Sequence, residues 1–297
     1  PICPIRQVFV SSTGVIGEIL DSSKIKNALP KLYRKLTPKD WAAAARAIMT
    51  TDTFPKGATR SANINGRIVT INGIAKGSGM IAPNMCTMLS YIFTDARLPS
   101  KLLQGMLTAA NKKSFNAITV DGDTSTSDTV IAFATGTVPL GFDPISLRDP
   151  RLIGFRAALD SLMVDLAQQI VRDGEGASKF VTISVRGAAS SEAARGIAFS
   201  IANSPLVKTA IAGSDPNWGR IVMAIGKAGQ QINHDELAVR IGRFPITEGG
   251  GVRAEYNESP VAEYMKGTEI DIEVDVGVGR GRATVWTCDL THRYIAI

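Results

Sequence analysis

The chain is poor in the residues on which many catalytic and metal sites depend. Its 297 residues include two histidines, His234 and His292, and three cysteines. Two histidines leave little material for a Ser-His-Asp or Cys-His catalytic system, and no cysteine–histidine spacing matches a zinc site. Three cysteines without paired spacing give no disulfide framework, which favours a reducing compartment such as the cytoplasm, or the mitochondrial matrix in a eukaryote.

Long apolar segments and aromatic residues are also scarce. No run of eighteen apolar residues occurs and no secretory signal opens the chain, so a membrane partner is not expected. The net charge is +6, from 33 basic and 27 acidic residues, and aromatic residues make up 6% of the chain. Apart from short runs, the basic residues are scattered and no aromatic ladder accompanies them. A solvated basic face that attracts anionic substrates is therefore preferred over a nucleic-acid partner.

Glycine and apolar residues, in contrast, are plentiful. The 28 glycines and 44% apolar content are typical of a large α/β protein with many tight turns. The chain opens at Pro1 and ends at Ile297 in strand-like segments, which indicates a fragment of a longer protein. Strands become more frequent beyond Glu175. We therefore predict a first α/β domain at 1–172 and a second, strand-rich α/β domain at 173–297.

The spacing of apolar residues predicts the individual elements. The run Thr37-Pro38-Lys39-Asp40 has the composition of a helix start, which predicts a helix over 41–49. Apolar residues at helical spacing predict helices over 102–110, 155–170 and 192–202. Alternation and short apolar runs predict strands at 8–10, 67–75, 88–93, 117–120, 129–134, 180–185, 237–241, 270–276 and 283–288.

The most informative stretch is Lys76–Ser90, which contains Thr87. A threonine hydroxyl is a poor nucleophile unless a base removes its proton, and the α-amine of a chain-terminal threonine can be that base. An internal threonine reaches this state only if the preceding bond is cut. The glycine-rich loop before Thr87 could hold a strained peptide bond between Cys86 and Thr87. From chemistry alone, an ordinary loop before a strand is the alternative.

Two further glycine-containing turns could carry chemistry. A strand ending at Thr13-Gly14 exposes N–H groups and a hydroxyl that could form an oxyanion hole, although a plain turn has the same composition. Glu175 lies between glycines at the end of a predicted helix, where its carboxylate could bind an ammonium group. A helix cap with a solvated carboxylate is the alternative.

Two polar loops complete the candidates. The loop Asp121–Asp128 resembles a calcium site, but an EF-hand needs glycine at its sixth position and glutamate at its twelfth. Those positions hold Thr126 and Ala132, so an EF-hand is excluded. Two interpretations of this loop remain. It could hold a magnesium ion, but a hydrogen-bonded turn is the preferred interpretation. The polar groups of the loop Asp215–Arg220 could orient a substrate, or they could only stabilise the loop by hydrogen bonds within it.

Taken together, these residues closely resemble the ornithine acetyltransferase family, also called bifunctional glutamate N-acetyltransferase. The resemblance covers essentially the whole chain, and its longest motif surrounds Thr87. The motifs follow in family order: Ser12-Thr13-Gly14-Val15-Ile16-Gly17, Thr51-Asp52-Thr53, Lys76-Gly77-Ser78-Gly79-Met80-Ile81-Ala82-Pro83-Asn84-Met85-Cys86-Thr87-Met88-Leu89, Asp121-Gly122-Asp123-Thr124-Ser125-Thr126-Ser127-Asp128-Thr129, Asp215-Pro216-Asn217-Trp218-Gly219-Arg220 and Cys288-Asp289-Leu290-Thr291-His292.

The resemblance implies a self-processing acetyltransferase of arginine biosynthesis. The precursor would cut itself between Cys86 and Thr87 into an α chain, 1–86, and a β chain, 87–297, which assemble as a heterotetramer. Thr87 would take the acetyl group of N2-acetyl-L-ornithine and pass it to L-glutamate in a ping-pong reaction. The implied fold is a layered α-β-β-α sandwich of the self-processing N-terminal-nucleophile type.

The resemblance also assigns the site residues, without a metal or cofactor. It places the oxyanion hole at Thr13 and Gly14, and the substrate contacts at Thr53, Lys76, Thr87 and Glu175. From their charges we expect Lys76 to bind a substrate carboxylate and Glu175 the ornithine ammonium. Acetyl-CoA as a second acetyl donor is left open.

The sequence departs from the family pattern in a few places. Cys86 stands where alanine is common and Ser127 where asparagine is common, and family segments at both ends are missing. Two alternatives stay open. One is a threonine-nucleophile aminopeptidase or amidase on the same scaffold. The other is a relative that binds amino acids without catalysis.

Overall fold

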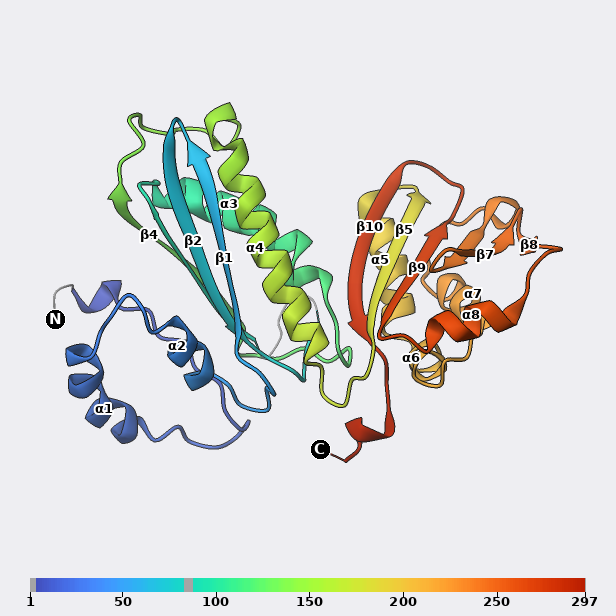
Figure 1. Ribbon diagram of the computed structural model, residues 1–297, viewed down its shortest axis with the longest axis horizontal. Coiled ribbons are helices and arrows are strands. Elements are labelled where there is room, and N and C mark those ends of the chain that lie inside the picture. Colours follow the sequence, from blue (N-terminus) through green and yellow to red (C-terminus); the bar gives the residue numbers. More distant parts are fainter. Residues whose placement is uncertain (1–3, 83–87, 297) are drawn as a thin grey trace.

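The computed structural model describes residues 4–82 and 88–296, and its strands form two separate β-sheets (Figure 1). The first sheet has the strand order β1-β2-β3-β4. Its first three strands pair antiparallel, and β3 pairs parallel with β4. The strands of this sheet are β1 (Lys56–Ile64), β2 (Arg67–Lys76), β3 (Leu89–Ala96) and β4 (Thr129–Val138).

A tight hairpin joins β1 to β2. Ile64 pairs with Arg67, so that Asn65 and Gly66 alone form the connection. Both have positive φ, 51° and 79°, as a two-residue hairpin of type I′ requires, and Asn-Gly is the preferred pair for it. The turn fixes the register that carries β2 to its end at Lys76.

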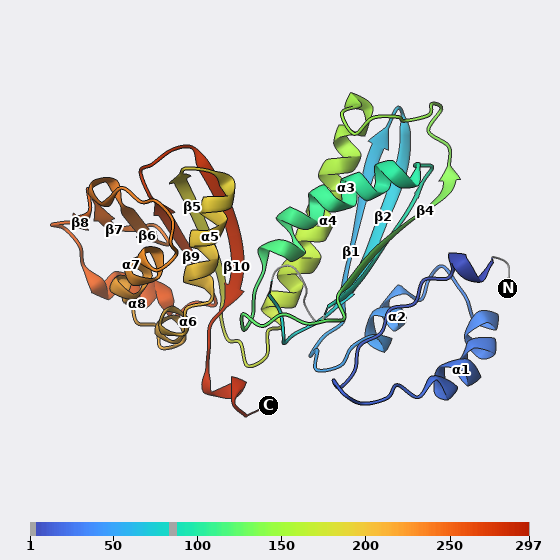
Figure 2. The same ribbon diagram turned by 180° about the vertical axis from the view of Figure 1, so that it is seen from behind.

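Two long helices cover one face of this sheet (Figures 1 and 2). They are α3 (Ser100–Lys113) and α4 (Ile153–Arg172). Leu159, Leu162 and Leu166 lie on one side of α4 at helical spacing and are fully buried with Ile71 of β2 in the first core. This buried face explains why the apolar spacing of 155–170 predicted the helix correctly.

The second sheet has the strand order β10-β5-β9-β6-β7-β8 and its own apolar core. Strand β5 pairs antiparallel with β10 and parallel with β9. The strands are β5 (Phe180–Ala188), β6 (Ala238–Ile241), β7 (Phe244–Glu248), β8 (Gly251–Val252), β9 (Glu269–Asp275) and β10 (Gly281–Cys288). The helices are α5 (Ser191–Ala202), α6 (Pro205–Ala212), α7 (Trp218–Gly226) and α8 (Glu258–Met265).

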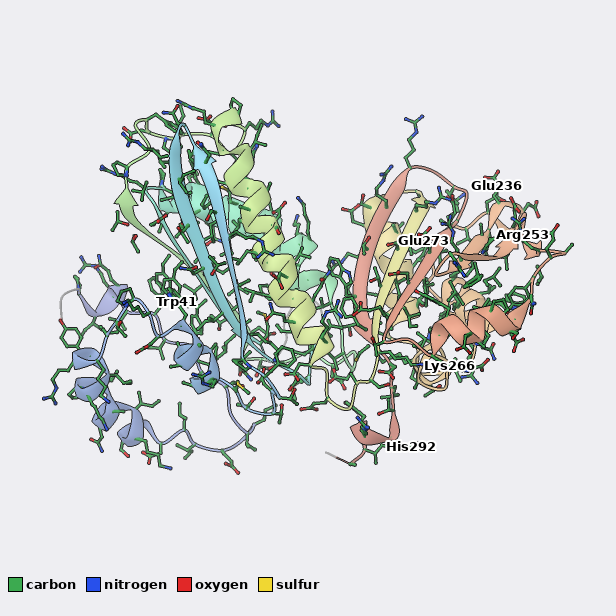
Figure 3. All side chains as sticks on the ribbon, viewed as in Figure 1. Trp41, Glu236, Arg253, Lys266, Glu273 and His292 are labelled. Carbon is green, nitrogen blue, oxygen red and sulfur yellow. The ribbon has the colours of Figure 1, made fainter. Side chains whose placement is uncertain are left out.

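The segment before β1 crosses the other face of the first sheet. It contains α1 (Ser22–Arg34) and α2 (Trp41–Ala47). Trp41 lies edge-on to Phe93 of β3, with 5.3 Å between ring centroids, and Figure 3 shows Trp41 near that sheet. Phe93 stacks on Phe133 of β4 at 5.1 Å.

The predicted strand at 8–10 is wrong. Ile5–Gln7 form a 3-10 helix, and the three residues that follow lie outside any strand. Their exposed fractions are 53% at Val8, 67% at Phe9 and 85% at Val10. A strand needs a partner for its backbone N–H and C=O groups, and no described strand pairs with this segment. The ring of Phe9 lies edge-on to Phe133 of β4, with 6.3 Å between ring centroids.

The remaining differences involve short elements. The predicted strand at 117–120 is a 3-10 helix, Phe115–Ala117, followed by a single β-bridge between Ile118 and Trp286. Helix α7 (Trp218–Gly226) begins within the loop predicted at Asp215–Arg220. Sequence spacing missed α1, β1, α6, β7, β8 and α8. The structure also adds 3-10 helices at Pro150–Leu152, His234–Glu236 and His292–Tyr294. The α/β class is confirmed, and none of the described helices is both long and apolar enough to cross a membrane.

Candidate functional site

Three segments that are distant in sequence meet at one end of the first sheet. They are the stretch that enters β1, the stretch that leaves β2 and the turn that ends α4, all at the lower ends of these elements in Figure 1. Asp52 of the first segment accepts hydrogen bonds from the backbone N–H groups of Thr50, at 3.1 Å, and Gly77, at 2.7 Å. The carboxylate therefore joins the approach to β1 to the exit of β2.

A buried lysine joins this pair to the end of α4. The Lys56 ammonium lies 2.5 Å from an Asp52 oxygen and 2.6 Å from an Asp173 oxygen. The exposed fractions of the three side chains are 0% for Lys56, 0% for Asp52 and 2% for Asp173. Burial raises the pKa of Asp52, but the N–H of Gly77 and the Lys56 ammonium outweigh it, so that its pKa lies below the ordinary value. The three side chains therefore form a buried triad with two short ion pairs.

Thr53 is held directly by the triad. Its backbone N–H donates to Asp173 at 2.9 Å, and its hydroxyl donates to the other oxygen of the same carboxylate. A carboxylate that accepts both groups fixes the rotamer and the backbone of one residue at once. The predicted substrate contact Thr53 thus has a defined orientation.

Lys76 is the second predicted contact, and it is 1% exposed at the end of β2. Its ammonium donates to the Thr50 hydroxyl at 3.1 Å. Burial lowers the pKa of Lys76, while the charges of Asp52 and Asp128 partly oppose this shift. The charge of Glu175 acts on Lys76 in the same direction. A buried lysine ammonium that has no ion pair within the described residues is suited to binding an anion.

Glu175, the third predicted contact, lies against the loop that follows Lys76. Its backbone N–H donates to the Ser78 carbonyl at 2.9 Å. A Cβ atom built on Gly79 would overlap the Glu175 carboxylate oxygens, so only glycine allows this close approach. Ser78 also shares a 2.7 Å hydrogen bond with the Thr51 hydroxyl. The structure therefore brings Thr53, Lys76 and Glu175 together.

The loop 121–128 holds the chain on both sides of the undescribed stretch. Asp121 accepts hydrogen bonds from the N–H groups of Met80, at 2.6 Å, and Ile81, at 3.1 Å. Asp128 accepts one from the N–H of Met88 at 2.9 Å. The two carboxylates therefore bracket residues 82–87 of the chain.

The described residues contain no group of three or more His, Cys, Asp or Glu side chains that could hold a metal ion.

Asp128 is unusual because only one of its oxygens is satisfied. Its Oδ2 is buried and has no hydrogen-bond partner among the described residues. Burial raises the pKa of Asp128 to about 6, against the lowering effects of the Met88 N–H and the Lys76 charge. Sequence reasoning considered Asp128 only as part of a loop for magnesium or a hydrogen-bonded turn, and not as a partner of the chain beside Thr87. The sequence feature that could have indicated this role is the position of Asp128 at the end of a polar loop, directly before β4.

The other predicted site residues form two groups. Thr13 and Gly14 belong to the N-terminal segment, and Cys86 and Thr87 lie outside the described residues. Thr13 is half-buried and Gly14 is exposed, and neither forms a hydrogen bond or ion pair with the described residues of the cluster. Nearby, the Ser11 hydroxyl lies 2.5 Å from the Tyr91 hydroxyl of β3. The proposed cleavage residues Cys86 and Thr87 lie outside the described residues. The oxyanion hole and the cleavage site therefore stay predictions.

Two C-terminal motifs have bracing contacts. Arg220 donates to the Leu206 carbonyl at 2.8 Å within the second lobe, so the loop 215–220 connects α7 to α6. Asp289 accepts from the N–H groups of Ser178 and Lys179 at 2.8 and 2.9 Å. The Thr291 hydroxyl donates to the carbonyl next to Glu175, that of Gly176, at 2.6 Å. The tail after β10 thus supports the turn that carries Glu175.

The fold and this network define a two-sheet α/β protein with a charged site where the first sheet meets the end of α4. The model of the ArgJ family matches residues 2–297. The chain belongs to the ArgJ family.

Relatives and a solved structure agree with this assignment. The chain is 56% identical over 297 residues to the arginine biosynthesis bifunctional protein ArgJ of Gluconobacter oxydans, with 99% of this chain and 69% of the relative covered. It is 56% identical to the protein of that name from Zymomonas mobilis, covering 99% and 72%. The crystal structure of the ArgJ protein from Bacillus halodurans aligns with a TM-score of 0.66 at 39% identity, over 69% of this chain and 95% of that one.

Proposed function

We propose that this protein is a glutamate N-acetyltransferase of arginine biosynthesis that moves an acetyl group from N2-acetyl-L-ornithine to L-glutamate. Membership of the ArgJ family and the name of its relatives, arginine biosynthesis bifunctional protein, support this activity. The observation that carries the proposal is how three segments meet beside the buried Asp52–Lys56–Asp173 triad. Thr53 donates to Asp173, and Asp52 accepts the N–H of the residue after Lys76. The N–H of Glu175 donates to the Ser78 carbonyl in the loop that follows Lys76. Lys76 supplies a cation and Glu175 a carboxylate for an amino-acid substrate.

The nucleophile in this proposal is Thr87, freed by cleavage of the bond to Cys86. Its α-amine accepts the hydroxyl proton while the oxygen attacks the acetyl carbonyl. The amide C–N bond breaks, the ornithine nitrogen takes the proton, and an acetyl ester remains on Thr87. The amine of glutamate then attacks this ester, which gives N-acetylglutamate and restores the hydroxyl. Thr13 and Gly14 would stabilise the tetrahedral oxyanion of both steps.

The hydrogen bonds around residues 82–87 support self-processing. Asp121 fixes two N–H groups before this stretch and Asp128 fixes one directly after Thr87. Self-cleavage is an intramolecular reaction, and holding the chain on both sides of the reacting bond favours reactions of this kind. The two product chains would remain associated, as an assembly of two α and two β chains.

Charge assigns the two ends of the substrate. The buried Lys76 ammonium would bind the α-carboxylate that acetylornithine and glutamate share, and Glu175 would bind the side-chain ammonium of ornithine. We expect Lys76→Ala to raise KM for both substrates by roughly 10- to 100-fold, because a charge-assisted hydrogen bond contributes about 1.5–3 kcal/mol. Steady-state kinetics measures this change, with the exposed Lys101→Ala as the control. An unchanged KM for either substrate would remove the assignment.

The activity is tested by following labelled acetyl from N-acetylornithine. The expected result is labelled N-acetylglutamate when glutamate is present and no transfer by the Thr87→Ala variant. Labelled acetate formed at the same rate with or without glutamate would show an amidase instead. Binding of N-acetylornithine without either product would show a non-catalytic relative.

A further inference from the structure

A short hydrogen bond joins the N-terminal segment to the first sheet. The Ser11 hydroxyl lies 2.5 Å from the Tyr91 hydroxyl of β3. Figures 1 and 2 show the N-terminal segment, drawn in blue, on the side of this sheet away from α4. Within the described parts of the chain, no other hydrogen bond links residues 9–20 to the rest of the protein. The position of this segment therefore depends strongly on one pair of hydroxyl groups.

The alternation of side chains along β3 explains why Tyr91 faces this segment. Successive side chains of a strand point to opposite faces of the sheet. Ile92 is 2% exposed and belongs to the core that the first sheet shares with α4. Its neighbours Tyr91 and Phe93 therefore lie on the opposite face, where Phe93 contacts the ring of Trp41. The place of Tyr91 in the strand directs its hydroxyl toward the N-terminal segment.

The hydrogen bond at Ser11 also restricts Thr13, the predicted oxyanion-hole residue. Ser11 and Thr13 are half-buried, whereas Ser12 and Gly14 are exposed. This alternation indicates that the side chains of Ser11 and Thr13 lie on the same side of the segment, toward the protein. Two residues span at most about 7 Å of chain. A hydrogen bond at Ser11 therefore confines Thr13 to a small volume beside the sheet.

The other partner of this hydrogen bond belongs to a rigid strand. Tyr91 pairs with Ile74 of β2 on one side and with Ile131 of β4 on the other, so the backbone of β3 is held from both sides. Tyr91 lies two residues after Leu89, about 7 Å along the strand, and Leu89 follows Thr87 by two residues in the sequence. The strand that follows the proposed nucleophile thus also holds the predicted oxyanion hole.

We propose that Tyr91 is a positioning residue for acetyl transfer, and that its hydrogen bond to Ser11 holds Thr13 and Gly14 where they stabilise the tetrahedral oxyanion. This inference rests on the proposed function and adds a residue to it. Groups of an oxyanion hole are effective because they are held in place before the charge develops. A segment with a single hydrogen bond to the sheet depends on that bond for its order, so Tyr91 acts through the segment and not on the substrate.

Steady-state kinetics of the processed enzyme tests this role. Tyr91→Phe keeps the ring and removes only the hydroxyl. We expect kcat to fall about tenfold, less than the roughly 10²–10³-fold cost of removing an oxyanion-hole donor itself. KM for N-acetylornithine and for glutamate should stay unchanged, because an interaction made only in the transition state lowers kcat without weakening substrate binding. Tyr33→Phe is the matched control, since Tyr33 of α1 is 59% exposed, and it should leave kcat unchanged.

A double-mutant cycle separates the hydrogen bond from any other role of the tyrosine. Ser11→Ala removes the second hydroxyl, so it should lower kcat by the same factor as Tyr91→Phe. The double variant should be no slower than either single variant, because both remove one interaction. Ser11→Thr keeps a hydroxyl and should retain kcat. The inference is overturned if Tyr91→Phe or Ser11→Ala has the kcat of the unmodified enzyme, or if the two losses multiply in the double variant.

Amide hydrogen exchange separates this inference from the proposed function. Exchange over residues 9–16 should be faster in Tyr91→Phe than in the unmodified protein and unchanged in Tyr33→Phe, because a segment that loses its hydrogen bond to the sheet opens more easily. Equal exchange in Tyr91→Phe and the unmodified protein would overturn the inference. If exchange rises as expected but the unmodified protein moves no acetyl group from N-acetylornithine to glutamate, the hold of Tyr91 on the segment stands and the proposed function fails.

Discussion

Thr53 and Thr13 belong to equally recognisable sequence motifs, yet the structure holds them in different ways. Thr53 donates two hydrogen bonds to a carboxylate that is itself buried against Lys56. Thr13 lies on a segment whose apolar neighbours, such as Val15 and Ile16, are 68% and 75% exposed. A motif therefore shows which residues occur together in the chain, whereas the packing around each one decides how firmly it is held.

The largest effect should come from the buried triad. Lys56→Met removes the cation between Asp52 and Asp173 and leaves two dry carboxylates facing each other. We expect the free energy of unfolding to fall by about 3–5 kcal/mol, as measured for other buried ion pairs that lose one partner. Chemical denaturation measures this loss. The exposed Lys101→Met should stay within about 0.5 kcal/mol, and a loss below about 1 kcal/mol at Lys56 would show that the triad does not hold the site.

A smaller and more selective effect is expected from Gly79→Ala. The new Cβ would overlap the Glu175 carboxylate and displace it from the substrate, so KM for N-acetylornithine should rise about tenfold, equivalent to roughly 1.4 kcal/mol. KM for glutamate, which has no side-chain ammonium, should change less. Gly226→Ala is the control, because a Cβ at Gly226 meets no atom within 4 Å. Equal changes in both KM values would contradict the role of Glu175.

The pH dependence of stability should reveal Asp128. Its pKa in the folded protein is about 6 against an ordinary value of 3.8. The folded chain therefore binds this proton more tightly than the unfolded chain, and the resulting stability is present below the lower value and lost as the pH rises through 6. Asp128→Asn has no such loss, so its Tm relative to the unmodified protein should increase from pH 4 to pH 7. A constant difference in Tm would show that the carboxyl is not buried as described.

The smallest effect is expected in the N-terminal segment. Phe9 is 67% exposed and contacts Phe133 only edge-on. Phe9→Ala should lower the free energy of unfolding by less than about 1 kcal/mol, measured in the same denaturation experiment as Lys56→Met. A loss as large as that of Lys56→Met would show that both regions are held equally firmly.

Sequence reasoning was most successful where one periodic face is buried in one core. The helix over 155–170 and the strand over 180–185 were predicted because their apolar residues repeat with the period of the element. Strand β1 was missed because its exposed and half-buried positions carry Gly57, Thr59 and Arg60, which do not form a clear alternating pattern. The strand at 8–10 was wrongly predicted because a short apolar run shows nothing about a pairing partner.

For the site, the resemblance supplied Thr53, Lys76 and Glu175, and the structure brings these three together. The sequence could not show that Lys56 and Asp173 join them, because the two are far apart in the chain and each reads as an ordinary charged residue. The role of Asp128 was equally hidden, since it depends on which N–H its carboxylate meets after folding.

The central claim is that Thr87 becomes a chain terminus and then carries the acetyl group. Intact mass under denaturing conditions, before and after brief exposure to N-acetylornithine without glutamate, tests it most directly. The account predicts two chains that separate between Cys86 and Thr87, with one acetyl group added to the chain that begins at Thr87 and removed by glutamate. A single uncut chain, or two chains of which neither gains an acetyl group while transfer activity persists, would contradict it.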